Sequence, residues 1–286
     1  MGEIGIDIGG SGVKAVRLGP DGARRCARVG YTRPNLATLE QSIAQVARDV
    51  AAETGDVLGV CAPGVHKAGE VIYAANLPCL QGVRVSELTV RACGVAETRA
   101  VLTDAAATGL GSWRLAPVEG RLLTLAMGTG VGGALIEDGR SLTIDGSTIG
   151  HLGQMDVSIG EPEAPVGPDG GRGSLEAYVG WPALVGRFGE NGAAAGIAAM
   201  GPDDPVVLAL VRAIRVCHAL YKPDVIRLVG GVGALFEPRL TLLLAQVADG
   251  LTGVARPSWR LETMDDPYIA ALGAAQAADS VGGGDG

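Results

Sequence analysis

Short apolar runs that end in glycine-rich turns organise the chain. The first run, residues 4–8, is followed by Gly9-Gly10-Ser11-Gly12 and by a second apolar run at 13–18. The pattern returns at residues 122–127, where Gly128-Thr129-Gly130 follows the run and precedes another one. Each pattern predicts a β-strand, a tight turn and a returning strand.

Helical and extended segments follow both hairpins. Apolar positions at helical spacing predict a helix over residues 42–54, with Ile43, Val46 and Val50 on one face. Further helices are expected at 88–93, from Asp104 to about 110, at 205–221 and at 268–278, and buried strands at 57–62, 100–103 and 225–229. The glycine-rich residues 281–284 predict a disordered tail. Strand, turn, strand and helix recur in both halves, which predicts an α/β protein with mixed sheets covered by helices.

The composition narrows the functional class. With 286 residues, 47% hydrophobic and 19% charged, the chain is long enough for two folded domains. The net charge of −8, without a long Lys/Arg cluster, argues against nucleic-acid binding. The five cysteines are scattered without a CxxC pair, which indicates reduced thiols in the cytoplasm. No apolar stretch has the length of a membrane span, and the early first strand leaves no room for a signal peptide.

The two glycine-rich turns suggest phosphate binding. Turns built from glycine, serine and threonine let backbone N–H groups and hydroxyls approach phosphate oxygens. A single turn of this kind is weak evidence, because ordinary hairpins also use glycine. Two such turns with Asp104 between them, at the end of a predicted strand, suggest a kinase. The alternative for Asp104 is a cap of the alanine-rich helix that follows it.

Seven segments, read in order along the chain, carry a family resemblance. They are residues 7–14 and 128–133 as phosphate motifs, 76–82 as a sugar-contact segment, 103–105, 149–151, 173–178, and 230–233 as an adenosine motif. Together they resemble the ROK family of sugar kinases, within the actin/hexokinase/Hsp70-like superfamily. The resemblance implies two ribonuclease H-like (actin-like ATPase) domains, at residues 1–112 and 113–286, with an interdomain cleft. It also implies that the terminal helix packs back on the N-terminal domain.

The resemblance further implies roles for individual residues. Asp104 is the implied general base, which accepts the proton of the attacking hydroxyl, and Asp7 is the implied contact of Mg²⁺ through bound water. The implied contacts of ATP are Gly9, Gly10, Ser11, Gly128, Thr129, Gly130, Gly230, Gly231 and Gly233. The implied sugar contacts are Gly64, Asn76, Thr103, Asp104, His151 and Glu176.

Several of these residues have simpler interpretations. Asp7 is also compatible with a turn-capping carboxylate, and Glu176 with a surface charge near a helix start. His151 is equally compatible with a structural histidine. Lys14 lies just beyond the first turn, and we expect it to be a solvated strand residue rather than a phosphate ligand.

The chain departs from the family pattern at three places. The cysteines of the family's zinc site correspond here to Gly167, Asp169 and Ser174, so no structural zinc is expected. Thr148 stands where the family has a glutamate and Thr103 where it has an asparagine, both of them sugar contacts in the family. Replacing a two-pronged polar group with a hydroxyl predicts weak activity on glucose, or another acceptor such as an amino sugar, an N-acetyl sugar or another polyol.

The predicted function is therefore an ATP- and Mg²⁺-dependent kinase of a hexose or hexose derivative, by default at the 6-hydroxyl. Two alternatives stay open. The Gly-Gly-Ser-Gly turn also resembles that of polyphosphate-dependent glucokinases, although the adenosine motif favours ATP. A non-catalytic sugar sensor is the other alternative; the retained Asp7 and Asp104 argue against it, and no helix-turn-helix fits ahead of Gly5. The resemblance also implies a cytoplasmic homodimer whose partner is a small sugar, with no nucleic-acid or membrane partner.

Overall fold

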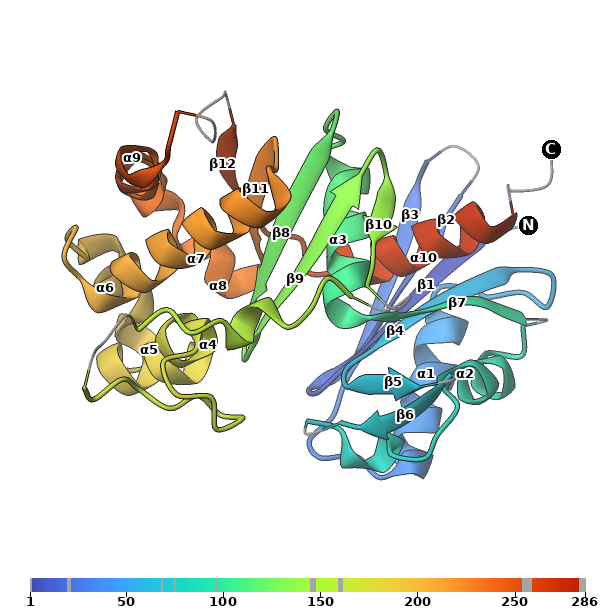
Figure 1. The fold of residues 1–286 in the computed structure, drawn as a ribbon. Coiled ribbons are helices and arrows are strands. Elements are labelled where there is room, and N and C mark those ends of the chain that lie inside the picture. The colour runs from blue at the N-terminus through green and yellow to red at the C-terminus, as the bar shows by residue number, and fades with distance from the viewer. Residues whose placement is uncertain are drawn as a thin grey trace. The chain divides into compact units, whose positions relative to one another are not determined.

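A computed structural model of the protein describes residues 2–19, 22–67, 69–74, 76–95, 97–144, 148–158, 162–253 and 259–282. The chain divides into two compact units, drawn in Figure 1. The first contains the described residues up to 116 and those from 268 onward, and the second contains the described residues from 117 to 267. Each unit has its own sheet and its own hydrophobic core.

The first unit is built on a sheet whose strands lie in the order β3-β2-β1-β4-β7. These strands are β1 (Glu3–Gly9), β2 (Gly12–Leu18), β3 (Arg24–Gly30), β4 (Val57–Ala62) and β7 (Glu97–Thr103), and a separate hairpin consists of β5 (Val65–Lys67) and β6 (Glu70–Tyr73). The helices are α1 (Leu36–Asp49), α2 (Val85–Cys93), α3 (Asp104–Leu115) and α10 (Ile269–Gly282), with a 3₁₀ turn at Pro78–Leu80. Because β1, β4 and β7 run parallel, their carboxyl ends lie at the same edge of the sheet.

Alternation along β1 directs its two faces toward different helices. Ile4, Ile6 and Ile8 are fully buried in a core cluster that also contains Ile43 of α1. The residues between them point to the opposite face, as the period of two along a strand requires. On that face α10 packs on β1 and β4 and lies alongside α3 (Figure 1).

Helix α10 approaches the sheet backbone to backbone. A Cβ atom built on Gly5 would lie 1.7 Å from the carbonyl oxygen of Ala271, and one built on Gly59 would lie 1.8 Å from that of Ala274. No side chain fits into either contact, since interiors are packed at van der Waals separations. The fit of this helix therefore depends on glycine at both strand positions.

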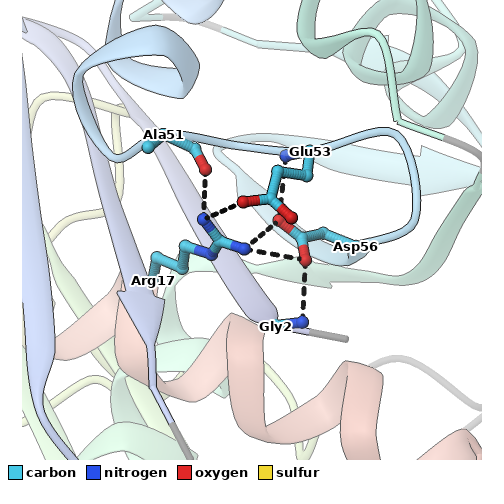
Figure 2. A network of polar contacts seen from close by, with 5 residues as sticks. All are labelled: Gly2, Arg17, Ala51, Glu53 and Asp56. Atoms are coloured by element: carbon cyan, nitrogen blue, oxygen red, sulfur yellow. Dashed lines mark hydrogen bonds and ion pairs between the residues drawn. The ribbon is translucent and has the colours of Figure 1, made fainter.

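A buried carboxylate joins the start of β1 to the loop before β4, as Figure 2 shows. Asp56 is 2% exposed; its Oδ1 accepts a hydrogen bond from the Gly2 N–H at 2.7 Å, and its Oδ2 lies 3.0 Å from Nη2 of Arg17 on β2. Arg17 also donates to the carbonyl oxygen of Ala51 and lies 3.4 Å from Glu53 Oε1. The segment between α1 and β4 is thus fixed to a strand more than thirty residues before it.

The second unit has a sheet in the order β10-β9-β8-β11-β12. Its strands are β8 (Arg121–Met127), β9 (Val131–Glu137), β10 (Arg140–Leu142), β11 (Val225–Val229) and β12 (Arg260–Met264). Its helices are α4 (Leu175–Val179), α5 (Trp181–Phe188), α6 (Ala193–Ala199), α7 (Pro205–Tyr221), α8 (Gly230–Leu235) and α9 (Leu240–Gly250), with 3₁₀ turns at Leu152–Gln154, Glu190–Gly192 and Glu237–Arg239. β8 pairs antiparallel with β9 and parallel with β11. The core joins Leu123 and Leu228 of the sheet to Leu210 and Ile214 of α7.

The predicted elements agree best where one pattern covers a whole element. The strands at 57–62 and 225–229 and the helix at 205–221 are confirmed at both ends. The bounds of the helix expected at 42–54 are wrong, because α1 spans Leu36–Asp49. Asn35 begins it by accepting the Thr38 N–H at 2.8 Å, and it stops before Ala51, whose φ of 56° is left-handed.

Other ends also differ from the prediction: β7 begins at Glu97 rather than 100, α3 ends at Leu115 rather than about 110, and α10 spans Ile269–Gly282 rather than 268–278. α2 begins at Val85, three residues before the expected position 88. The disordered tail expected at 281–284 is wrong for residues 281 and 282, which belong to α10, while 283 and 284 lie outside the described residues. Within the described part of the chain, no helix is long and apolar enough to cross a membrane.

Candidate active site

The first glycine-rich turn joins β1 to β2. Gly9 pairs with Gly12, so Gly10 and Ser11 form the turn itself, and both are exposed. Tyr31, which follows β3, holds the turn from one side: its hydroxyl donates to the Gly9 carbonyl at 2.6 Å, and its N–H donates to the Ser11 carbonyl at 3.1 Å. Because these carbonyls are engaged, the turn offers amide groups rather than carbonyl oxygens to an anion. Sequence reasoning missed Tyr31.

Asp7 lies two residues before this turn, between two neighbouring strands. Lys14 is its register partner on β2, with Nζ 3.6 Å from Asp7 Oδ2, and Cys61 is its partner on β4, with Sγ 3.6 Å from Oδ1. Burial raises the pKa of Asp7; Lys14 opposes this rise, and the negative charge of Asp104 adds to it. Lys14 is a strand residue, as expected, but it is only partly exposed, and its ammonium group pairs with Asp7.

Asp104 is the first residue of α3 and directly follows β7. The cap of this helix is Thr103, whose Oγ1 accepts the Ala106 N–H at 3.3 Å. Asp104 Oδ1 accepts the Ala105 N–H at 2.8 Å. Desolvation by the surrounding protein atoms raises the pKa of Asp104, although solvent still reaches its side chain. The Ala105 N–H and His66 oppose the rise. A reachable carboxylate with a raised pKa is suited to accept a proton.

The other predicted sugar contacts of the first unit lie beside the turn and beyond β4. Asn76 is exposed, and its Cβ would be 3.5 Å from a Cβ built on Gly10. Gly64 has a φ of 107°, and a Cβ there would lie 2.2 Å from the Tyr73 carbonyl oxygen, so only glycine fits where β4 turns into β5. The structure therefore brings Asn76 close to the predicted phosphate turn.

The second glycine-rich turn belongs to the second unit and joins β8 to β9. The Gly128 N–H donates to the Gly130 carbonyl at 2.9 Å, and the Gly128 carbonyl accepts the Trp181 N–H at 2.9 Å. Glu176 of α4 is 7% exposed and accepts the Val131 N–H on Oε2 at 2.8 Å. Burial raises the pKa of Glu176, and the Val131 N–H opposes the rise.

Glu176 is therefore not a surface charge. A Cβ built on Gly130 would lie 2.6 Å from Glu176 Oε2, so the carboxylate sits directly against the turn. The third turn residue, Thr129, has its carbonyl beside Gly180, at the start of α5. Glu176 thus connects α4 to the turn through its hydrogen bond with the Val131 N–H. The sequence had suggested for it only a sugar contact or a surface charge.

His151 and the positions of the missing zinc ligands lie in the segment between β10 and α4. His151 is exposed and precedes the 3₁₀ turn, and Thr148 Oγ1 accepts the Gly150 N–H at 3.2 Å. Ser174 is buried and caps α4 by accepting the Ala177 N–H at 3.3 Å. Gly167 is buried and Asp169 exposed. No group of three His, Cys, Asp or Glu side chains suited to a metal ion occurs among the described residues.

The predicted adenosine motif forms the junction of β11 and α8. Gly230 has a φ of 90°, and a Cβ there would lie 2.8 Å from the carbonyl oxygen of Met127 at the end of β8. Gly231 is exposed and Gly233 is buried in the short helix. The junction thus lies next to the strand that carries the second turn.

Comparison with known proteins identifies the family. The family model described as "ROK family" matches residues 3–247. The chain belongs to the ROK family. This fold is confirmed by a ROK family glucokinase from Streptomyces griseus, solved with glucose and AMPPNP, which is 20% identical, has a TM-score of 0.73 and covers 98% of this chain and 99% of its own. The expected α/β class of the actin-like ATPases is therefore correct.

Two curated relatives of this ROK protein are named as kinases of N-acetylated sugars. The N-acetylmannosamine kinase of Citrobacter koseri is 31% identical over 189 residues, which is 62% of this chain and 61% of the relative's length. The N-acetylgalactosamine kinase AgaK of Shewanella sp. strain ANA-3 is 28% identical over 283 residues, which is 90% of each chain.

Proposed function

We propose that this ROK protein is a sugar kinase that transfers the γ-phosphate of ATP to a hydroxyl group of an N-acetylated hexosamine. The observation that carries the proposal is the pair of carboxylates in the first unit. Asp7 precedes an exposed glycine-rich turn, Asp104 begins α3, and the two lie close enough for the charge of Asp104 to raise the pKa of Asp7. A phosphate turn, a metal-contacting carboxylate and a base at one sheet edge are the parts that phosphoryl transfer needs.

In the proposed reaction, Asp104 accepts the proton of the sugar hydroxyl as its oxygen attacks the γ-phosphorus of ATP. The bond between that phosphorus and the β–γ bridging oxygen breaks, and ADP leaves. Oδ1 of Asp104 is already bonded to the Ala105 N–H, which fixes the carboxylate and favours Oδ2 as the proton acceptor. The amides of Gly10 and Ser11, which are exposed residues of the first unit, are suited to bind phosphate oxygens. In the second unit, the amides of the turn at Gly128 to Gly130 are suited to the same ligand chemistry.

Asp7 fits a contact with Mg²⁺ through water better than direct coordination. Its two oxygens face Lys14 and Cys61, and Mg²⁺ in such enzymes is held mainly by water, phosphates and one or two carboxylates. Bound there, the ion would neutralise charge on the transferring phosphate. Lys14 and Cys61 hold the Asp7 carboxylate from the two flanking strands.

The class of the sugar acceptor is inferred from Thr103 and Thr148, which depart from the family pattern, and from the names of the curated relatives. Thr103 uses its hydroxyl to cap α3, and Thr148 Oγ1 bonds the local backbone, so neither offers the amide or carboxylate of the glucokinase pattern. Both curated relatives are named as kinases of N-acetylated hexosamines. By default we propose phosphorylation of the 6-hydroxyl.

The test is ADP release with Mg-ATP across glucose, mannose, N-acetylglucosamine, N-acetylmannosamine and N-acetylgalactosamine, with polyphosphate as a second donor. An N-acetylated sugar should give the highest kcat/KM, and Asp104→Asn should lower kcat by about 10²- to 10⁴-fold while sugar binding persists. Asp203→Asn, an exposed carboxylate in the second unit, is the matched control and should leave kcat unchanged. Glucose as the best acceptor by far contradicts the substrate class, and turnover that survives Asp104→Asn contradicts the base.

A further inference from the structure

The hairpin of β5 and β6 holds a histidine that the sequence patterns did not single out. Val65 and Lys67 on β5 are exposed, whereas His66 between them is half-buried. His66 pairs with Val71 of β6, which is fully buried. Since paired residues project to the same side of a hairpin, His66 points inward with Val71.

The inward position leaves one ring nitrogen without a partner. Nε2 of His66 is shielded from solvent and forms no hydrogen bond with any described residue. Buried polar atoms of folded proteins are nearly always hydrogen-bonded, so this nitrogen, which lacks a partner among the described residues, calls for one. Because solvent does not touch Nε2 in this structure, the imidazole has to turn for Nε2 to meet a ligand.

The strands place His66 at the sheet edge that carries Asp104. β4 pairs parallel with β7, with Ala62 opposite Thr103. The chain that leaves β4 through Gly64 to His66 therefore emerges at the same edge as Asp104, which follows β7. The electrostatic effect of His66 on Asp104, which lowers the pKa of Asp104 against the larger effect of burial, agrees with this proximity.

We propose that His66 determines acceptor specificity, with Nε2 forming a hydrogen bond to the sugar hydroxyl next to the one that Asp104 deprotonates. This inference rests on the proposed function, because it assumes that a sugar binds at Asp104. The ligand class is a polyol with two neighbouring hydroxyls, one for the carboxylate and one for the imidazole. For transfer to the 6-hydroxyl of a hexopyranose, the second hydroxyl is the 4-hydroxyl, because C5 carries the ring oxygen.

The kinetic test compares His66→Gln and His66→Ala with Lys67→Ala, an exposed neighbour on the same strand. His66→Ala should raise the KM of the best sugar by about 10- to 100-fold, with kcat and the KM of ATP nearly unchanged. His66→Gln should recover part of the loss, because its amide places a nitrogen near the position of Nε2. Lys67→Ala should match the unaltered protein.

Monodeoxy analogues of that sugar identify the hydroxyl. The analogue that lacks it should bind weakly to the unaltered protein and lose little more in His66→Ala, because both changes remove one interaction. An unchanged sugar KM in His66→Ala overturns the proposal. So does a loss of melting temperature accompanied by equal changes in every kinetic constant, which would show a structural role. Additive losses for every analogue also overturn it.

A binding measurement separates this proposal from the kinase assignment. The chain has three histidines, so the imidazole NMR signals can be assigned with one variant each. Addition of a sugar from the panel without ATP should move the His66 signal and leave the buried His218 signal in place. A sugar that binds and moves His66 without being phosphorylated contradicts the kinase and supports the contact. A sugar that binds without moving it overturns the contact alone, and binding of no sugar overturns both.

Discussion

Gly59→Ala tests whether the close contact of α10 with the sheet stabilises the first unit. The new methyl group would lie 1.8 Å from the carbonyl oxygen of Ala274 and 2.6 Å from its carbonyl carbon. Relief of this overlap requires a shift of about 1.4 Å between helix and strand, since non-bonded atoms pack at van der Waals distance. Both contacting groups are backbone, so no side chain can rotate away.

The expected loss of unfolding free energy in Gly59→Ala follows from this geometry. Overpacking a core typically destabilises by about 1–3 kcal/mol, and a backbone contact belongs at the upper end of that range. For a protein of this size, about 3 kcal/mol corresponds to a melting temperature roughly 6–12 °C lower. The conformation itself adds no penalty, because Gly59 lies inside β4 and its φ is not positive.

The assay is thermal unfolding followed by circular dichroism, together with urea unfolding at constant temperature. Gly55→Ala is the control: it lies four residues earlier, and a Cβ there meets nothing within 4 Å. We expect Gly55→Ala to change the unfolding free energy by less than about 0.5 kcal/mol. If Gly59→Ala melts with the unaltered protein, or if both variants lose the same stability, the inferred backbone contact between α10 and β4 is wrong.

Three further changes test the electrostatics of the two units. Lys14→Met should raise the pKa of Asp7 further and move the acidic limb of the kcat/KM profile to higher pH, whereas Lys14→Arg should leave this limb where it is in the unaltered protein. If the acidic limbs of the two variants coincide, the pairing of Lys14 with Asp7 is contradicted. Burial lowers the pKa of His218, so on acidification the unfolded chain takes up a proton on this imidazole before the folded protein does, and stability falls as the pH drops below about 6.5. His218→Phe should therefore flatten the slope of unfolding free energy against pH on the acid side. An unchanged slope would show that His218 is not the source of the pH dependence. Glu262→Gln removes the negative charge that lies 2.9 Å from the buried Arg227 guanidinium. The free energy of unfolding in urea should fall by about 1–3 kcal/mol, less than for a fully buried pair because Glu262 is partly exposed. An unchanged urea midpoint would contradict a stabilising role of this ion pair.

Local pattern determined the elements of this protein. The apolar runs at β4 and β11 and the helical spacing of α7 coincide with the structure at both ends, because one continuous period covers each element. The start of α1 was missed because its first turn has few apolar residues, although Asn35 is a readable cap signal. The order of the glycine-rich turns and of Asp7 and Asp104 identified the family, since each motif is contiguous in the chain.

Only the tertiary structure decided what surrounds those carboxylates. Cys61 lies 54 residues from Asp7 in the chain and reaches it only through the register of β4 on β1. His66 reaches the edge that carries Asp104 through the pairing of β4 with β7. Such neighbours depend on which strands pair and in which register, and a local pattern of apolar and polar residues does not specify a partner so far away in the sequence.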